Sequence, residues 1–294
     1  MSPSVILKSS APAKVNLSLK LVGKRADNYH LLDSVFVPVN FLFDELEIVL
    51  NDGKSSVKMS SNLPEMTDAS ANLCSKAAEL YFKMTDIGVD CHIKLQKNIP
   101  IGAGLGGGSS DCGAVLKMLN DHYRKMTDAQ LAETALTLGA DVPFFLSGKI
   151  SRIGGIGEKI EPLDCPFNGH LLIIFPPFSI NTAWAYKNLD PSIIGHDPSK
   201  MTDILCSSLK NDDILTACRH LQNDFESLIF RKFPAYFIWR ENLLANGAFH
   251  VGLSGSGSAF FAVFDDVEKL RSAAALFGEK YGGTLKMFYD QENL

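Results

Sequence analysis

Residues 100–110 form a glycine-rich stretch, Pro100-Ile101-Gly102-Ala103-Gly104-Leu105-Gly106-Gly107-Gly108-Ser109-Ser110, which we call the glycine segment. Apolar and polar residues alternate over 91–96, which predicts a strand leading into it. After it, Ser109 or Ser110 is expected to cap a helix with Asp111 in its first turn. Because glycine lacks a Cβ atom, successive N–H groups can turn toward one anion, and the helix start adds partial positive charge. The segment therefore predicts a phosphate cradle rather than a flexible linker.

Three common phosphate-binding motifs do not account for this segment. The spacing Gly102-x-Gly104-x-x-Gly107 matches the dinucleotide fingerprint, but the acidic residue about 20 positions on is Asp128 at a predicted helix start, not at a strand end. Gly148-Lys149 lacks the neighbours that a Walker A loop requires. No His-Arg-Asp or Asp-Phe-Gly triplet is present, which disfavours a protein kinase.

The rest of the chain predicts a two-domain protein that mixes strands and helices. A length of 294 residues is enough for about two domains, and prolines and glycines crowd the middle, so we place the boundary near residue 165. Apolar periodicity predicts strands at 13–21, 35–39, 46–50, 91–95, 170–175 and 260–264, and helices at 72–84, 128–138, 215–230 and 235–246. This mixture favours an α/β or α+β architecture. In the first strand, half-buried by its alternation, Lys14 and Asn16 share one face.

Composition narrows the partners and the compartment. The net charge is -5 and basic clusters are short, so we expect no nucleic acid partner. Six scattered cysteines without metal-binding spacing indicate buried, reduced thiols, and no signal peptide is visible, so we expect a cytoplasmic protein. Two long uncharged stretches, 165–186 and 242–264, are interrupted by prolines, glycines or polar residues, so neither is expected to span a membrane.

Three further constellations carry chemistry. Asp141 follows a predicted helix end, and Pro143 suits the start of the next helix, so Asp141 is either an N-cap or a catalytic carboxylate. Gly252–Ser258 is a second glycine–serine turn, before an apolar strand. Arg25–His30 combines charge, an aromatic ring and a histidine on a predicted loop, where ordinary surface is the simpler interpretation.

Together these segments resemble the superfamily of small-molecule kinases that includes galactokinase, homoserine kinase and mevalonate kinase, known as the GHMP kinases. Ala11–Leu17, the glycine segment and Gly252–Ser258 match its three motifs in order. Within it, Arg25–His30, Leu138–Phe145 and the triple glycine resemble the 4-diphosphocytidyl-2-C-methyl-D-erythritol kinase family. The resemblance implies an α+β fold of two domains, with the active site in the cleft between them: an ATP-binding domain at 1–165 and a C-terminal domain at 166–294.

The resemblance also implies a reaction and a set of site residues. ATP, with Mg²⁺, would phosphorylate the 2-hydroxyl of the cytidyl-linked methylerythritol, a small-molecule substrate of non-mevalonate isoprenoid synthesis. Lys14 would orient Asp141 and offset negative charge, while Asp141 would accept the hydroxyl proton. Residues 100–110 would bind the nucleotide, with Ser110 a candidate contact to the metal. The matched substrate-binding positions are Asn16, Tyr29, His30, Lys97 and Tyr186.

Several questions stay open at this level. Asn28 replaces the glycine usual before the Tyr-His pair, but asparagine tolerates left-handed backbone geometry, so we expect the turn to persist. Asn223–Glu226 resembles a segment of the same family, where a helix start explains it as well as a catalytic role does. The alternatives to the main hypothesis are a sister kinase acting on homoserine or mevalonate, which the Tyr29-His30 pair disfavours, and a nucleotide-binding regulator without activity.

Overall fold

The computed structural model describes residues 4–53, 56–68, 72–195 and 199–290 and divides into two compact units. The first unit contains the chain up to Ala13, Leu42–Pro100 and Gly106–Gly148. The second contains Lys14–Phe41, Ile101–Leu105 and the chain from Lys149 onward. Two long strands, β1 (Val5–Lys24) and β2 (His30–Asp52), contribute residues to both units.

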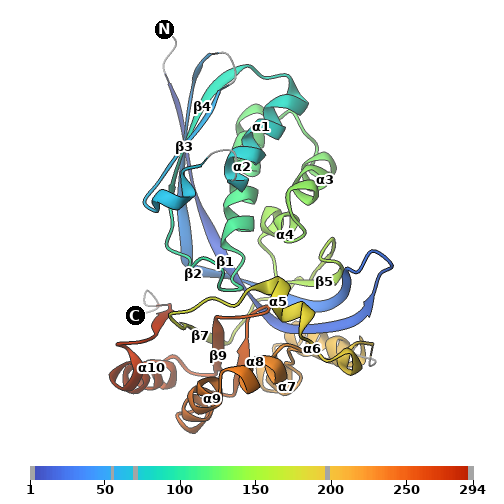
Figure 1. Ribbon diagram of the computed structural model, residues 1–294, viewed down its shortest axis with the longest axis vertical. Coiled ribbons are helices and arrows are strands. Elements are labelled where there is room, and N and C mark those ends of the chain that lie inside the picture. Colours follow the sequence, from blue (N-terminus) through green and yellow to red (C-terminus); the bar gives the residue numbers. More distant parts are fainter. Residues whose placement is uncertain (1–3, 54–55, 69–71, 196–198, 291–294) are drawn as a thin grey trace. The chain divides into compact units, whose positions relative to one another are not determined.

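In the first unit, helices cover one face of a sheet (Figure 1). The N-terminal part of β1 and residues 45–52 of β2 form this sheet with two shorter strands, β4 (Val89–Gln96), antiparallel to β2, and β3 (Val57–Ser61), parallel to β4. A short 3₁₀ helix, Pro64–Met66, follows β3. The helices are α1 (Leu73–Thr85), α2 (Gly107–Tyr123), α3 (Asp128–Leu138) and α4 (Val142–Ser147). Buried side chains such as Ile48, Ile93, Tyr81 and Leu116 fill the space between the two layers.

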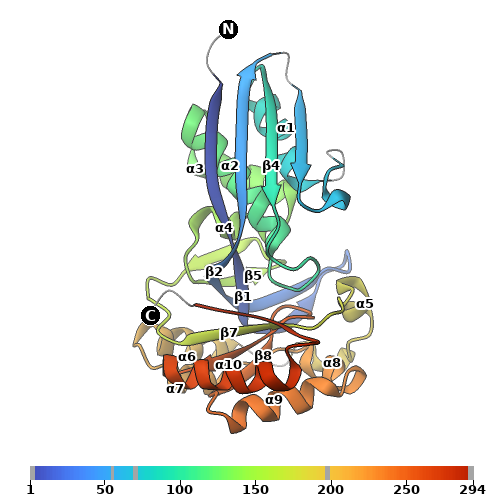
Figure 2. The same ribbon diagram turned by 90° about the vertical axis from the view of Figure 1, so that its left-hand side faces the viewer.

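The second unit contains a four-stranded antiparallel sheet with helices packed against it (Figure 2). Its strand order is β10 (Lys286–Tyr289), β7 (His170–Phe175), β9 (Phe260–Phe264) and β8 (His250–Leu253). The helices are α5 (Thr182–Lys187), α6 (Ser199–Lys210), α7 (Ile214–Arg219), α8 (Glu226–Lys232), α9 (Ala235–Ala245) and α10 (Val267–Tyr281), with a 3₁₀ turn at Pro191–Ile193. Residues 32–36 of β2 also pair here with β5 (Ser151–Gly155), which pairs with β6 (Lys159–Pro162).

The mixed α+β architecture is confirmed, but three local predictions are wrong. The predicted strands 35–39 and 46–50 belong to one strand, β2, which runs through Asp44 because its carboxylate is buried and accepts hydrogen bonds from the N–H groups of Asn98 and Ile99. The predicted half-buried strand 13–21 is buried on both faces over residues 13–19. The predicted helix 215–230 is divided into α7 and α8, because residues 220–225 adopt a turn and bridge structure.

The compact units do not divide the chain at residue 165. The second unit already includes the chain from Lys149, and it takes in two earlier segments as well. The physical reason is that β1 and β2 are long enough to contribute to two cores. Within the described ranges, no helix combines the length and the hydrophobicity that crossing a membrane requires.

Candidate functional site

The first half of the glycine segment, Ile101–Leu105, is bound by backbone contacts within the second unit. The Leu105 carbonyl accepts a hydrogen bond from the N–H of Lys14 at 2.9 Å, and the Ala103 carbonyl accepts one from Ala259 at 2.9 Å. The Ser254 hydroxyl donates to the Gly104 carbonyl at 2.9 Å. The segment is therefore attached both to β1 and to the glycine–serine turn, Gly252–Ser258, so two of the motifs singled out in the sequence meet here.

Gly104 explains why this half needs glycine. Its φ is +78°, in the left-handed region, and a Cβ atom would lie 2.3 Å from the Ser254 carbonyl oxygen and 3.0 Å from that of Gly257. Both neighbours are backbone atoms, so a small shift of a side chain cannot make room. This glycine permits close packing of two backbone segments.

The second half of the glycine segment begins helix α2 in the first unit. Gly106 is the N-cap, with a left-handed φ of 73°, and among the described residues no side chain caps the helix. The prediction that Ser109 or Ser110 caps it is wrong, because the left-handed Gly106 starts the helix earlier and both serines lie in its first turns. The first N–H groups of a helix have no intrahelical partner, so they remain available to an anion.

The hydroxyl of Ser110 is a second unsatisfied group at this helix start. Ser110 is 1% exposed, and its Oγ has no hydrogen-bond partner among the described residues. A buried polar atom without a partner costs free energy, which suggests that it serves a ligand. A cavity of about 190 Å³ adjoins the helix start and is lined by residues that include Gly108, Asp111 and Asn72.

Lys14 and Asn16 lie next to each other on β1, as predicted from their shared face. Both side chains are buried, and Lys14 Nζ donates to Asn16 Oδ1 at 2.5 Å. The same ammonium lies 4.1 Å from the centre of the Phe36 ring, a cation–π contact. Asn16 Nδ2 donates to Ser34 Oγ at 3.2 Å. The cation is thus held in a defined position by a neutral amide and a ring.

Asp141 occupies the N-cap position of α4, but its side chain makes no capping hydrogen bond there. Pro143 lies in the first turn of this helix, as expected. Asp141 is therefore at the N-cap position without acting as a side-chain cap.

The predicted aromatic residues come together in the second unit. The rings of His30 and Tyr186 stack with centroids 5.1 Å apart and an interplanar angle of 29°, whereas Tyr29 is 61% exposed on the turn before β2. Asn28 has a φ of 70°, so the expected left-handed turn is present. Burial and the charge of Lys24 lower the pKa of His30, which keeps its ring neutral near pH 7.

Lys97 lies apart from these residues, in the first unit. It is 7% exposed, and its ammonium bonds to the carboxylates of Asp44 and of Asp111, the latter at 2.7 Å. Burial alone would lower the pKa of Lys97, but the two carboxylates raise it, so the side chain stays charged. The predicted contact of Lys97 with substrate stays a prediction. Through these two ion pairs, Lys97 connects the end of β4 to β2 and to α2.

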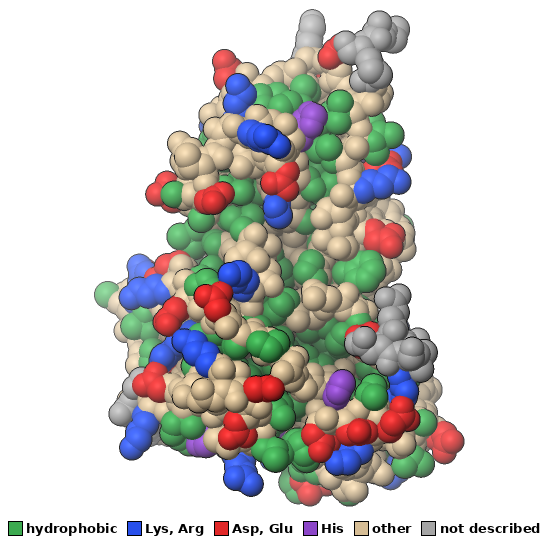
Figure 3. All heavy atoms as spheres, turned by 180° about the vertical axis from the view of Figure 1, so that it is seen from behind, with side chains coloured by type: hydrophobic (Ala, Val, Ile, Leu, Met, Phe, Trp, Pro, Cys, Tyr) green, Lys and Arg blue, Asp and Glu red, His purple; other side chains and the backbone are tan. Residues whose placement is uncertain are grey.

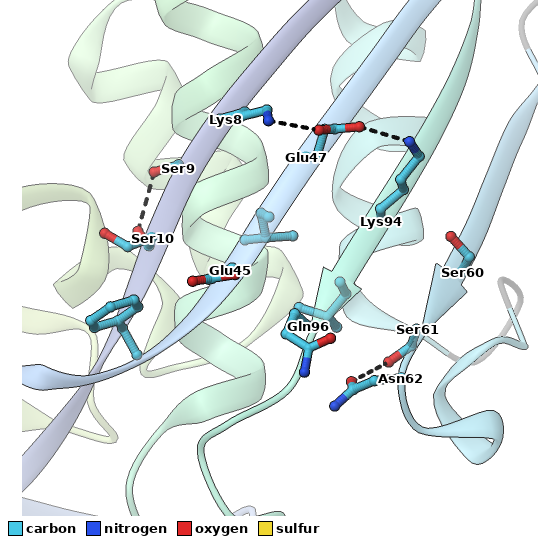
Figure 4. A pocket seen from close by; sticks show the side chains of 13 residues that line it. Lys8, Ser9, Ser10, Glu45, Glu47, Ser60, Ser61, Asn62, Lys94 and Gln96 are labelled. Carbon is cyan, nitrogen blue, oxygen red and sulfur yellow. Dashed lines mark hydrogen bonds and ion pairs between the residues drawn. The ribbon is translucent and has the colours of Figure 1, made fainter.

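The outer face of the first unit's sheet carries a larger groove that contains none of the predicted site residues (Figure 4). Its volume is about 790 Å³, and Glu47 pairs with Lys8 at 3.1 Å and with Lys94 at 2.7 Å. Glu45 also lines the groove, so two carboxylates balance its two lysines. The groove therefore has no net positive charge to attract a phosphate. On the face shown in Figure 3, acidic and basic side chains are likewise intermixed.

Three groups of this site were not found from the sequence. They are Asp44 and Asp111, which hold Lys97, and Ser254, which holds Gly104. The position of Asp111 directly after the glycine segment was noted, but a contact with Lys97 depends on how β4 and α2 pack. Ser254 lies in a motif that was noted, and its serine was the available signal.

Comparisons with known proteins agree with this arrangement. Residues 72–149 match the model of the GHMP kinases N-terminal domain, and residues 207–280 match that of the GHMP kinases C-terminal domain. The 4-diphosphocytidyl-2-C-methyl-D-erythritol kinase of Chlorobium phaeobacteroides (strain BS1) is 40% identical over 274 residues, covering 92% of this chain and 93% of the relative. The chain belongs to the 4-diphosphocytidyl-2-C-methyl-D-erythritol kinase family of the GHMP kinases.

Further relatives support this membership. The enzyme of the same name from Chlorobaculum tepidum is 38% identical over 269 residues, or 90% of this chain and 92% of the relative. A crystal structure of a 4-(cytidine 5'-diphospho)-2C-methyl-D-erythritol kinase has a TM-score of 0.78 at 33% identity and covers 96% of this chain and 98% of its own. Homoserine kinase from Cytophaga hutchinsonii has a TM-score of 0.76 at 22% identity, covering 97% and 94%, and shows the shared fold alone.

Proposed function

We propose that this protein is an ATP-dependent kinase that phosphorylates the 2-hydroxyl group of 4-diphosphocytidyl-2-C-methyl-D-erythritol. The observation that carries the proposal is the uncapped start of α2, with its glycine N-cap and the unpartnered Ser110 hydroxyl, in a chain of this kinase family. The identity to curated relatives over nine-tenths of the chain favours this substrate over homoserine or mevalonate.

The nucleotide is proposed to bind at the second half of the glycine segment. The N–H groups of Gly107, Gly108 and Ser109 and the partial charge of α2 suit the phosphates. The adjoining cavity contains carboxylates, which suit a ribose or a base better than a phosphate. The Ser110 hydroxyl fits a Mg²⁺ or phosphate contact because it is an oxygen donor without another partner. Bound Mg²⁺ would neutralise phosphate charge during transfer.

Lys14 and Asp141 are proposed to carry the chemistry. Asp141 would accept the proton of the attacking hydroxyl, a role that suits a carboxylate at a helix N-terminus that does not cap its own helix. Lys14 would offset the negative charge that develops on the transferring group, and its bonds to Asn16 and Phe36 keep the ammonium in place beforehand.

The His30–Tyr186 stack is proposed to recognise the cytosine. Two stacked rings offer a flat apolar face, and the His30 ring, neutral near pH 7, has both a hydrogen-bond donor and an acceptor for a polar base edge. Tyr29 is exposed beside His30 in the chain and would add a further face. Lys97 is assigned to structure instead, because two carboxylates occupy its ammonium.

The direct test is ADP release by the purified protein with ATP, Mg²⁺ and the cytidyl substrate. Homoserine and mevalonate serve as matched acceptors, and we expect turnover with the cytidyl substrate alone. Asp141→Asn should reduce kcat by about 10³-fold or more while the affinity for a non-hydrolysable ATP analogue changes less than threefold. Folded protein that binds the analogue but turns over none of the three acceptors would reject the proposal and favour a nucleotide-binding regulator.

A further inference from the structure

The side-chain amide of Asn223 is hydrogen-bonded to the backbone of the glycine–serine turn. Its Nδ2 donates to the Leu253 carbonyl at 2.9 Å and to the Gly255 carbonyl at 2.8 Å, and its Oδ1 accepts the N–H of Phe225 at 2.9 Å. Asn223 is buried, so each bond is shielded from water. One side chain thereby fixes both carbonyls that flank Ser254, the residue that holds Gly104.

Glu226 supplies the complementary acceptor. Its Oε1 accepts the N–H of Leu253 at 3.0 Å. The backbone of Leu253 is therefore bound on both sides, with its N–H on Glu226 and its carbonyl on Asn223. Gly252 leaves room for two side chains here, because a Cβ atom would lie 2.6 Å from His250 Nε2 and 3.1 Å from Glu226 Oε1.

The two residues between them contact other parts of the site. The ring of Phe225, fully buried, meets that of Tyr186 edge to face at 4.9 Å and 83°, and thus supports the ring that stacks on His30. Asp224 pairs with Lys20 and accepts the N–H of Leu21 at 2.7 Å, while the backbone of residues 222–224 bonds to Leu19 on β1.

Resting on the proposed function, we infer that Asn223–Glu226 is a positioning segment that serves both ligands of the kinase. Asn223 and Glu226 fix the turn that holds Gly104 in the first half of the glycine segment, and the chain runs on from there directly into the proposed nucleotide site. Phe225 fixes Tyr186, and so acts on the cytidyl substrate. Asp224 anchors the segment to β1. The four side chains are consecutive, so one short stretch sets the geometry of two binding functions.

The inference predicts that substitutions in adjacent positions separate the two affinities. Asn223→Asp keeps the acceptor for Phe225 but removes both donated bonds, and should weaken binding of a non-hydrolysable ATP analogue about tenfold while the cytidyl substrate's Kd changes less than twofold. Phe225→Leu should give the reverse pattern, with the substrate's Kd raised about fivefold. Both constants are measured by calorimetry, so neither depends on turnover.

Two further variants distinguish positioning from general stability. Glu226→Gln keeps an acceptor for Leu253 and should bind the analogue as the wild type does, whereas Glu226→Leu should lose about fivefold in affinity. Asp266→Ala removes an exposed N-cap from α10 and is the control, because it lowers stability without touching the turn. It should leave both affinities unchanged.

Each outcome decides the inference. Equal losses for both ligands in Asn223→Asp and Phe225→Leu, or the same losses in Asp266→Ala, would overturn it. If Asn223→Asp does not fold, the Glu226 pair with hydrogen exchange at the Leu253 amide decides instead, since only Glu226→Leu should expose that amide. If the wild type binds the analogue but not the cytidyl substrate, the proposed function fails, while the nucleotide half of the inference is still decided by Glu226→Leu against Glu226→Gln.

Discussion

The two halves of the glycine segment contain similar residues but differ in their hydrogen bonds. Backbone carbonyls of the first half are bound, whereas polar groups of the second half lack partners among the described residues. In Ile101–Leu105, the carbonyls of Ala103, Gly104 and Leu105 are bound, and the backbone of another turn presses on Gly104. In Gly106–Ser110, the helix start has no side-chain cap and the Ser110 hydroxyl has no partner among the described residues.

This difference teaches that a glycine-rich motif does not have one physical cause. The first half uses glycine because there is no room for a Cβ atom at Gly104, and its carbonyls are bound by β1 and by the glycine–serine turn. The second half uses glycine to start a helix without a cap, and it leaves N–H groups available for a ligand. Substitution of Gly104 in the first half should therefore lower stability, while removal of the Ser110 hydroxyl in the second half should change function with little effect on stability.

Gly104→Ala should produce the largest loss of stability. A Cβ atom would overlap a backbone oxygen at 2.3 Å, so the free energy of unfolding should fall by about 5 kcal/mol or more, measured by chemical denaturation. Gly148→Ala is the matched control, because Gly148 has a similar φ of +60° but no atom within 4 Å of a Cβ. It should cost only about 1 kcal/mol from backbone strain. Similar losses in the two variants would contradict the steric explanation.

Lys97→Met tests the ion pairs at the residue just before the glycine segment's approach, between β4 and α2. The free energy of unfolding should fall by about 3–5 kcal/mol, because the variant leaves two buried carboxylates without a cation. Lys94→Met, on the strand β4 that ends just before Lys97, is the control. Its ion pair with Glu47 is half exposed, so it should cost less than about 1 kcal/mol. Adding Asp111→Asn to Lys97→Met should recover part of the loss; a further loss would show that the charge of Asp111 is not the cause.

The features of this region that could be predicted from the sequence are those that local patterns carry. Alternation placed Lys14 and Asn16 on one face, as the structure confirms, and the glycine cluster predicted a phosphate cradle, which stays a prediction. Asn28 was expected to tolerate a left-handed turn, and its φ of 70° confirms this.

What could not be predicted depends on contacts between residues far apart in the chain. Lys97 matched a substrate-binding position, yet its partners Asp44 and Asp111 are 53 and 14 residues away. Asp44 also made β2 look like two strands, since a buried carboxylate inside a strand is recognisable only when its partners are known. The helix start at Gly106 was missed because serine is a common cap, and only the backbone angles show that glycine takes this position.

The pH dependence of stability in Glu226→Gln tests whether the Glu226 carboxyl group, which bonds to the glycine–serine turn, is buried as the structure shows. Burial raises the pKa of Glu226 from 4.5 to about 7, and burial with the charge of Arg240 lowers that of His250 from 6.5 to about 4. Between pH 4.5 and 7 the folded protein keeps a proton on Glu226 that the unfolded chain has released, so this group lowers stability as pH rises. His250 does the opposite between pH 4 and 6.5, since only the unfolded chain binds its proton.

The variant removes the Glu226 contribution and leaves that of His250. Its stability relative to the wild type should therefore increase from pH 4.5 to about 7, reach about 3 kcal/mol, and stay constant above that. Denaturation curves at half-unit pH steps measure the difference. A difference that does not depend on pH would show that Glu226 titrates normally.

Ser110→Ala should change stability least, and it tests the second half of the comparison most directly. The hydroxyl has no partner to lose, so the free energy of unfolding should stay within about 0.5 kcal/mol of the wild type or rise slightly. Affinity for the Mg²⁺ complex of a non-hydrolysable ATP analogue should nevertheless fall about tenfold, because the ligand loses an oxygen contact. Ser258→Ala is the control, since its buried hydroxyl also lacks a partner among the described residues but lies in the glycine–serine turn. If both variants leave the affinity unchanged, an unpartnered hydroxyl at a helix start is a packing feature, and the availability of the second half would rest on its N–H groups alone.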